Sequence, residues 1–213
     1  MPSLSDLTPA ERARLLAKPE GELGIALGEV MNQTNAKLLE TVYRRLRLQP
    51  RQSVLEIGFG NGHTAPLLIQ QADALTYTGI EIAQTMVAEA TAFNRALIDA
   101  GQAAFHLAPA EATPFNDATF DAAVAVNVVY FWSDAVRALT EICRVLRAGG
   151  LSIELVGAEP HRAIPGRPVA AIVLVTEGHA ALVERDEATV RDGDAMGVAG
   201  EVGEHCFQCW VWV

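Results

Sequence analysis

The chain has 213 residues, of which half are hydrophobic and 20% are charged, so a packed domain is expected rather than a disordered chain. Its formal net charge of −10 argues against a nucleic-acid partner held by many phosphate contacts. Three cysteines, two of them in a lone C-x-x-C at Cys206 and Cys209, are too few for a disulfide framework or a zinc site. We find neither a signal-peptide pattern nor an apolar run of about 18 residues, so we expect a soluble, cytoplasmic protein with no membrane partner.

Two helical segments are predicted before residue 50. The run Thr8-Pro9-Ala10-Glu11 combines an N-cap threonine, an early proline and a following glutamate, which indicates a helix that ends at about Ala17. A second helix is expected over roughly 23–48, where apolar residues recur at helical spacing: Leu38, Leu39, Val42, Tyr43 and Leu46. The arginines at 44, 45, 47 and 51 fit a solvated helix end better than a phosphate-binding patch.

Beyond residue 53, short apolar runs alternate with longer segments of helical periodicity. Strands are predicted over 53–58, 76–81, 103–108, 120–129 and 151–156, and helices over 62–71, 85–100 and 133–146. This alternation predicts βαβ units, a parallel sheet and an α/β fold. After Gly157, only 170–176 and 205–213 have the pattern of strands, and 185–203 shows no period that allows an assignment.

A glycine-rich loop follows the first of these strands. The strand contains an acidic residue near its end, Glu56, and then come glycines at 58, 60 and 62. A strand that opens into such a loop allows backbone amides to approach a nucleotide-like ligand closely. Dinucleotide-binding loops have the spacing G-x-G-x-x-G, and His63 stands where the third glycine of that pattern would be. The pyrophosphate fingerprint is therefore absent.

Two more features fall at strand ends, where α/β sheets bind their ligands. Glu81 ends the second strand, and a carboxylate there can accept hydrogen bonds from both hydroxyls of a ribose. Ala110 and Glu111 follow the third strand, where the ring edge of the same ligand would reach. Together with the glycine loop, these residues predict a ligand of nucleoside type.

From about Gly24 to Val156, these features make the chain resemble the class I S-adenosylmethionine-dependent methyltransferases, particularly the small-molecule branch called type 11. The resemblance implies a Rossmann-like doubly wound sheet, mostly parallel with an antiparallel C-terminal strand, and a helical N-terminal extension. It implies one methyltransferase domain over 1–213, with a helical extension or lid at 1–50, a cofactor-binding core at 51–157 and a divergent substrate region at 158–213. S-adenosyl-L-methionine is the implied cofactor, and no metal is expected.

The resemblance also gives roles to individual residues. The implied cofactor-binding residues are Glu56, Gly58, Gly60, Asn61, Gly62, Glu81, Ile82, Met86, Ala110, Glu111 and Asn127. In this set, Glu56 would orient the loop or the cofactor's amino group, Ile82 and Met86 would flank the adenine, and Asn127 would face the methionine end.

Other residues are open to two interpretations. Met31 and Asn32, near Gly28, are substrate candidates or parts of an ordinary helix. Tyr130 and Trp132 are substrate candidates or core packing. The run Arg144–Gly150 resembles the family's approach to its fifth strand, and we interpret it as support for the fold.

Methyl transfer from a sulfonium is an in-line displacement, so the protein must chiefly align the reactants and exclude water. No catalytic base can be assigned, and the sequence does not rank the possible ones: His63, His106, His161, Glu111 and Asp117. A small-molecule acceptor is expected, but its identity, the attacking atom and the oligomeric state stay open.

Two rival functions are considered. The first is an NAD-dependent oxidoreductase, which the glycine spacing disfavours. The second is a methyltransferase-like protein that binds the cofactor or a partner without turnover. It is suggested by the region after Gly157, which departs from the helix and antiparallel strand pair that family members usually have there.

Overall fold

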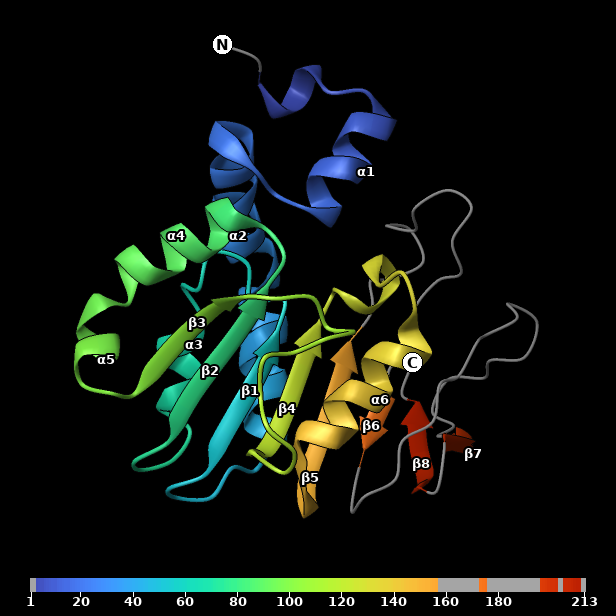
Figure 1. Ribbon diagram of the computed structural model, residues 1–213. Helices are drawn as coiled ribbons and strands as arrows, with labels where there is room; N and C mark the ends of the chain where they lie inside the picture. The colour runs from blue at the N-terminus through green and yellow to red at the C-terminus, as the bar shows by residue number, and fades with distance from the viewer. Residues whose placement is uncertain (1–2, 157–172, 176–195, 203–204, 212–213) are drawn as a thin grey trace. The chain divides into compact units, whose positions relative to one another are not determined.

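The computed structural model describes residues 3–156, 173–175, 196–202 and 205–211 (Figure 1). The chain divides into two compact units, Met1–Pro109 and Ala110–Val213. Each unit contains parallel strands and at least one helix, so the predicted α/β class is confirmed.

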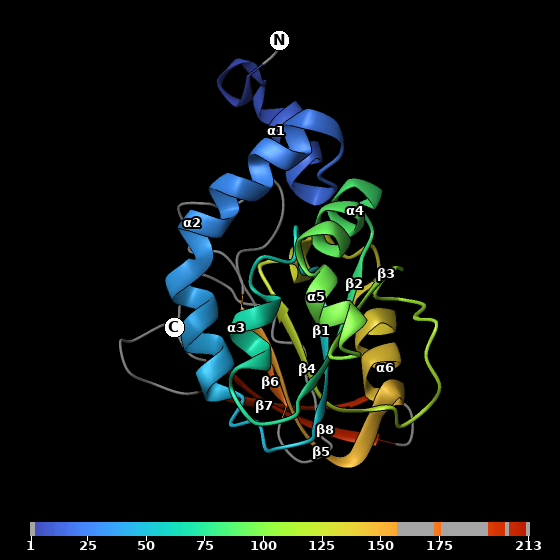
Figure 2. The same ribbon diagram turned by 90° about the vertical axis from the view of Figure 1, so that its left-hand side faces the viewer.

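The first unit begins with helices. After a short 3-10 helix, η1 (Leu4–Asp6), comes α1 (Pro9–Ala17), as predicted. The Thr8 hydroxyl accepts a hydrogen bond from the Glu11 N–H, and the Glu11 carboxylate accepts one from the Thr8 N–H, so the capping box is present. Helix α2 (Gly21–Arg45) begins and ends slightly earlier than expected. It packs beside α3 (Ala65–Ile69) and α4 (Gln84–Phe93) of the same unit (Figure 2).

Three parallel strands form the sheet of the first unit. Strands β1 (Ser53–Ile57), β2 (Thr76–Glu81) and β3 (Ala103–Leu107) pair in the order β3-β2-β1. Ile57 lies opposite Ile80, and Glu81 lies opposite Leu107. The carboxyl ends of the three strands, with the glycine loop and Glu81, therefore lie at one edge. The sheet is closely packed, since Leu55 and Ile80 have no exposed surface.

The helix predicted over 85–100 is divided in two, α4 (Gln84–Phe93) and α5 (Arg95–Asp99). The division is at Asn94, whose side chain donates hydrogen bonds to two backbone carbonyls, a competition with regular helix that asparagine often makes. The helix predicted over 62–71 is also shorter than expected, since α3 covers only Ala65–Ile69. The residues just before it have the loop conformation that is described below.

The second unit pairs β4 (Phe120–Val126) in parallel with β5 (Leu146–Val156). The strand predicted to reach residue 129 ends earlier, because Asn127 has a left-handed backbone (φ 58°) and a 3-10 helix, η2 (Val129–Phe131), follows. Helix α6 (Ala135–Val145) buries one face, as its periodicity predicted; the buried residues are Ala138, Leu139, Ile142 and Val145.

Three antiparallel strands complete this unit: β6 (Val173–Val175), β7 (Met196–Val202) and β8 (His205–Val211). The strand order of the unit is β4-β5-β6-β8-β7. The predicted antiparallel C-terminal strand is confirmed by β8. Strand β7 lies in the segment that had no assignable period. The antiparallel pair β7–β8 therefore supplies a feature that we expected this chain to lack.

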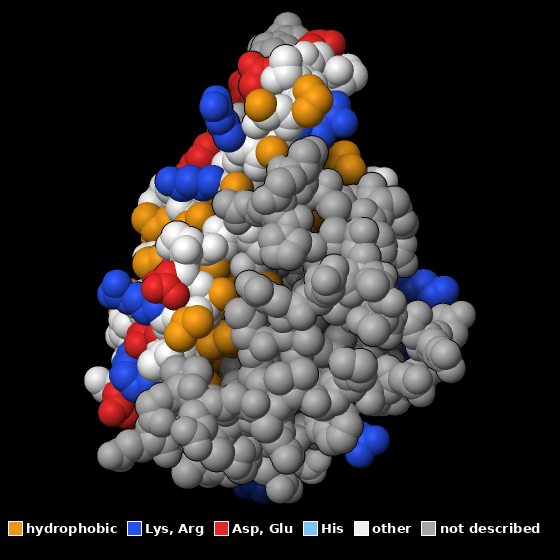
Figure 3. Space-filling view, turned by 90° about the vertical axis from the view of Figure 1, so that its right-hand side faces the viewer, with side chains coloured by type: hydrophobic (Ala, Val, Ile, Leu, Met, Phe, Trp, Pro, Cys, Tyr) orange, Lys and Arg blue, Asp and Glu red, His pale blue; other side chains and the backbone are white. Residues whose placement is uncertain are grey.

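Two charged side chains near the end of α2 form a local ion pair. Arg44 lies 2.9 Å from Glu40, one helical turn away, which supports the interpretation of the arginine cluster as a solvated helix end. On the face shown in Figure 3, basic side chains of the described residues lie among acidic and hydrophobic ones. Within the described ranges, the helices lack the combination of length and apolarity that a membrane span requires.

Candidate functional site

The glycine loop after β1 has three left-handed residues, Gly58, Gly60 and Gly62, with φ values of 72°, 62° and 71°. Only glycine adopts this backbone without strain. A Cβ atom on Gly60 would meet nothing within 4 Å, whereas one on Gly62 would lie 2.5 Å from the Cβ of Ala90 in α4. Gly60 thus borders open space, and the absence of a side chain at Gly62 allows the loop to pack closely against α4.

Glu81 lies at the end of β2 beside this loop. Its Oε1 accepts hydrogen bonds from the N–H groups of Ile82 (2.7 Å) and Ala83 (3.1 Å). Its Oε2 accepts a longer one from the N–H of Gly60 (3.3 Å). Burial raises the pKa of Glu81, since its side chain is only 8% exposed, and the three N–H donors oppose that rise. The carboxylate is therefore fixed in direct contact with the glycine loop.

These contacts fit the cofactor role that was predicted for Glu81 and the glycines. Within the described part of the chain, Oε2 receives only the long bond from Gly60, so it has lone pairs left for hydroxyl donors. The open space at Gly60 leaves room for a ligand beside it. Of the two residues predicted to flank an adenine, Ile82 is 41% exposed and Met86 is completely buried.

Glu56 is a buried carboxylate that binds two tyrosines. Its Oε1 accepts a hydrogen bond from the Tyr43 hydroxyl of α2 (2.8 Å), and its Oε2 accepts one from the Tyr77 hydroxyl of β2 (2.7 Å). Tyr43 Oη also lies 3.1 Å from Thr64 Oγ1, just before α3. Burial raises the pKa of Glu56, and the two phenols oppose the rise. The contacts fit the predicted role of orienting the loop; a role at the cofactor's amino group stays a prediction.

Helix α2 lies against the glycine loop. A Cβ on Gly28 would lie only 3.1 Å from Asn61 Nδ2, so this small residue allows the helix backbone to approach Asn61. Asn61 is 6% exposed. Met31 and Asn32, the substrate candidates of this helix, are half-buried. This close approach fits a packing role for Gly28, and the roles of Met31 and Asn32 stay predictions.

Sequence reasoning missed a contact that joins the start of α2 to α4. The Glu20 carboxylate accepts hydrogen bonds from the N–H groups of Gln84 (3.0 Å) and Thr85 (3.1 Å) and from the Thr85 hydroxyl (2.6 Å). The N-cap residue of α4 is Ala83, which makes no side-chain cap. Glu20 thus caps a helix far along the chain. In the sequence, the one signal for such a partner is that α4 begins without a capping residue of its own, so its first N–H groups need an acceptor from elsewhere.

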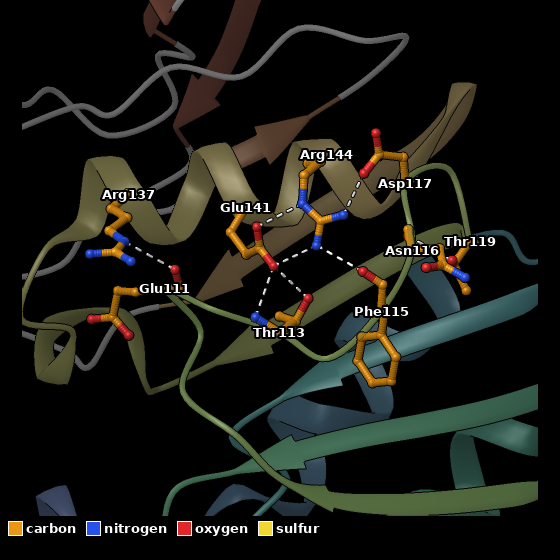
Figure 4. Close-up of polar contacts among 9 residues, drawn as sticks. All are labelled: Glu111, Thr113, Phe115, Asn116, Asp117, Thr119, Arg137, Glu141 and Arg144. Atoms are coloured by element: carbon orange, nitrogen blue, oxygen red, sulfur yellow. Dashed lines mark hydrogen bonds and ion pairs between the residues drawn. The ribbon is translucent and has the colours of Figure 1, made fainter.

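In the second unit, Glu111 contacts the start of α6 (Figure 4). Its Oε1 accepts hydrogen bonds from the N–H (3.0 Å) and the hydroxyl (2.9 Å) of Ser133, and Arg137 Nε donates to its backbone carbonyl (3.2 Å). Burial acts to raise the pKa of Glu111, but the hydrogen bonds outweigh it and lower the pKa. Ala110 beside it is buried. Contact of either residue with an adenine stays a prediction.

Asn127, Tyr130 and Trp132 follow β4 and are half-buried. The left-handed backbone of Asn127 is uncommon outside glycine, and such outliers often occur at functional positions. The ring of Tyr130 packs edge-to-face on Phe131, with 4.5 Å between the ring centroids. The contacts of these residues with cofactor and substrate stay predictions.

Arg144 joins α6 to the loop that precedes β4 (Figure 4). Its guanidinium forms ion pairs with Glu141 and Asp117, and it donates a hydrogen bond to the carbonyl of Phe115 (2.9 Å). Glu141 also accepts hydrogen bonds from the N–H and hydroxyl of Thr113. The bonds from Arg144, then those from Thr113, lower the pKa of Glu141 to about 2. These contacts support the interpretation of Arg144 as part of the fold.

The candidate bases that the structure describes have different surroundings. The His63 ring stacks on Phe93 (centroids 3.8 Å apart), and Asp117 is paired with Arg144. His106 lies on β3 in the first unit, and His161 lies outside the described residues. Among the residues that the structure describes, no group of three or more His, Cys, Asp or Glu has an arrangement that could hold a metal.

Comparisons with known proteins found a matching family model and similar proteins. Residues 55–153 match the model of a family described as "Methyltransferase domain". An O-methyltransferase of Pyrenophora dematioidea is 32% identical over 121 residues, which are 57% of this chain and 45% of that protein. The O-methyltransferase resE of Aspergillus sclerotiorum is 33% identical, over 57% of this chain and 46% of that protein. The chain thus spans about half the length of the curated relatives it matches.

Among solved structures, the cyclase SpnF is similar to this chain, with a TM-score of 0.54 and 30% sequence identity. The match covers 60% of this chain and 48% of that protein. The matched family region includes the glycine loop from Gly58 to Gly62, Glu81 and Asn127.

Proposed function

We propose that this protein transfers a methyl group from S-adenosylmethionine to a small-molecule acceptor, because residues 55–153 match the model of a methyltransferase domain and the chain resembles the class I enzymes that use this cofactor. The fold is accordingly Rossmann-like. The proposal concerns the activity of the whole protein, of which the family match covers one part.

The contact between Glu81 and the loop carries the proposal. A buried carboxylate accepts a hydrogen bond from Gly60, a loop glycine whose added Cβ would meet open space. An acceptor beside space of this kind suits the paired hydroxyls of a ribose. The G-x-G-x-G spacing supports an adenosyl ligand over a dinucleotide.

S-adenosylmethionine supplies an activated methyl group on a sulfonium when it is bound. The chain's own residues then have the tasks of binding and orientation. In this proposal Glu81 orients the adenosyl part, and Glu56 with Tyr43 and Tyr77 keeps the loop in place. Asn127, Tyr130 and Trp132 keep their predicted roles at the methionine end and the substrate. No base is assigned.

We propose an oxygen atom of the acceptor as the first to test, because both curated relatives are named O-methyltransferases. An aromatic or enolic hydroxyl would need to lose its proton before or during transfer. A panel of hydroxylated small molecules is therefore the first set of substrates.

The test has two steps. Isothermal titration should give saturable binding of S-adenosylmethionine and of S-adenosylhomocysteine, with no comparable binding of NADH. Incubation with S-adenosylmethionine and the hydroxylated panel should then give a product heavier by one methylene unit, detected by mass spectrometry. Binding of NADH alone would overturn the proposal.

A second candidate is a protein of this fold that binds the cofactor and does not transfer its methyl group. It is favoured by the similarity to SpnF, which is named as a cyclase. Saturable binding of S-adenosylmethionine, with no methylated product from a broad acceptor panel, would favour this candidate.

A further inference from the structure

We propose that Asn94 is a positioning residue for the cofactor loop, which it holds through the backbone carbonyl of Gly62. Asn94 lies between α4 and α5, outside the glycine motif and far from it in sequence. The inference rests on the proposed function, because a loop position has a measurable meaning only through the ligand that the loop binds.

The amide group of Asn94 is fully committed to backbone carbonyls. Its Nδ2 donates to the carbonyl of Gly62 (2.9 Å) and to the carbonyl of Ala90 (3.0 Å). An amide NH₂ has two donors, so both are used and the orientation of the group is fixed. The side chain is 2% exposed, so water does not compete for these bonds. The last glycine of the loop is therefore tied to the end of α4.

Packing alone does not account for an asparagine at this place. Its Oδ1 is buried and has no hydrogen-bond partner among the described residues. An unsatisfied buried acceptor lowers stability, and a leucine of similar size would avoid that loss. The asparagine also divides a helix that would otherwise be continuous. Both losses are understandable when the NH₂ group is needed for its bond to the loop.

The surrounding contacts show what this bond controls. Gly62 is pressed against Ala90, so the end of the loop has no room to shift toward α4. Gly60, two residues earlier, donates its N–H to Glu81. The bond from Asn94 to Gly62 stops the loop from moving away from α4. The shape of the loop is thus held at Gly60 by Glu81 and at Gly62 by Asn94.

The experiment compares Asn94→Leu with a core variant that leaves the loop alone, Leu75→Ala, whose side chain is 1% exposed. For each protein we measure S-adenosylhomocysteine affinity by calorimetry and the free energy of unfolding by urea. Asn94→Leu should weaken affinity about 5- to 30-fold, the effect of losing one or two hydrogen bonds. Leu75→Ala should lose stability and keep wild-type affinity.

Three outcomes would overturn the inference. If Asn94→Leu binds within twofold of wild type, the loop does not depend on Asn94, while the proposed function stands. If Leu75→Ala loses as much affinity, the effect follows general stability. If the wild type itself does not bind S-adenosylhomocysteine, the proposed function fails and this inference fails with it.

A measurement on the wild type covers the case in which Asn94→Leu does not fold. The side-chain NH₂ of Asn94 gives a pair of NMR signals that can be assigned in labelled protein. Addition of S-adenosylhomocysteine should shift these signals and slow the exchange of their protons. Signals that stay unchanged at saturation would contradict a role at the loop.

Discussion

At the scale of single residues, Glu81 is the group whose loss should be felt most directly by the ligand. Glu81→Ala should weaken the affinity for S-adenosylhomocysteine by about 1.5–3 kcal/mol, the range for hydrogen bonds to a charged group. Calorimetry measures the change, with Glu29→Ala on the exposed face of α2 as the control. Unchanged affinity in Glu81→Ala would show that the ribose is held elsewhere.

The same residue predicts how affinity depends on pH. Burial raises the pKa of Glu81 above its ordinary value of 4.5. Ligand hydroxyls that donate to the ionised carboxylate bind less well once it is protonated. Affinity should therefore fall on acidification, beginning above pH 4.5, and Glu81→Ala should remove this part of the fall.

Two glycines of the loop give a matched pair of variants. Gly60→Ala introduces backbone strain of about 1–2 kcal/mol at a left-handed position, with no steric clash. Gly62→Ala adds to the same strain a contact with Ala90 that is too short for two carbon atoms. Urea unfolding should therefore show the larger loss of stability for Gly62→Ala. Equal losses would mean that the loop can move away from α4.

At the scale of elements, α2 and the residue before it contact the rest of the unit at three points. Glu20 precedes it and caps α4, Gly28 contacts Asn61, and Tyr43 binds Glu56. The helix thus lies against the glycine loop. Its predicted action as a lid would need at least the Glu20 contact to open.

Removal of the Glu20 contact should loosen the start of α4. Glu20→Ala leaves the N–H groups of Gln84 and Thr85 without their acceptor, so stability should fall by about 1 kcal/mol, as for other helix caps. Glu29→Ala, an exposed acid beyond the first turn of α2, is the control and should change stability much less. Thermal unfolding of the two variants, recorded by circular dichroism, checks the difference; equal melting temperatures would contradict the cap.

At the scale of the whole molecule, buried and paired carboxylates make opposite contributions to pH stability. Glu141 has a pKa lowered to about 2, so its contribution is present above the ordinary value of 4.5 and is lost as pH falls toward 2. Glu56 and Glu81 have raised pKa values, so their contributions are present at low pH and are lost as pH rises through those values.

Glu141→Gln should therefore be less stable than wild type at neutral pH, by about 1–3 kcal/mol, because hydrogen bonds to a charged group are lost. The difference should shrink as pH falls from 4.5 toward 2. Urea unfolding of both proteins at a series of pH values measures it. A difference that does not depend on pH would mean that the charge of Glu141 contributes nothing.

Much of the fold could be predicted because its signals are local. The capping box of α1 lies within four residues, and the bounds of β2 follow from a short run rich in β-branched and aromatic residues. The glycine spacing and the position of Glu81 predicted the ligand class for the same reason, since the end of a parallel strand is recognisable from its own residues. The antiparallel strand β7 was missed because its sequence, rich in glycine, has no alternating pattern.

The sequence by itself determined the α/β class, the methyltransferase resemblance and the loop and acid that would receive the cofactor. Only the tertiary structure decided what holds them in place. Asn94 donates a hydrogen bond to Gly62, 32 positions away in the chain, and Glu20 accepts one from α4, 65 positions away. Two tyrosines donate hydrogen bonds to Glu56. The reason is physical. Such bonds depend on which side chains the packed helices and strands bring within about 3 Å, and neither spacing nor periodicity in the chain records that distance.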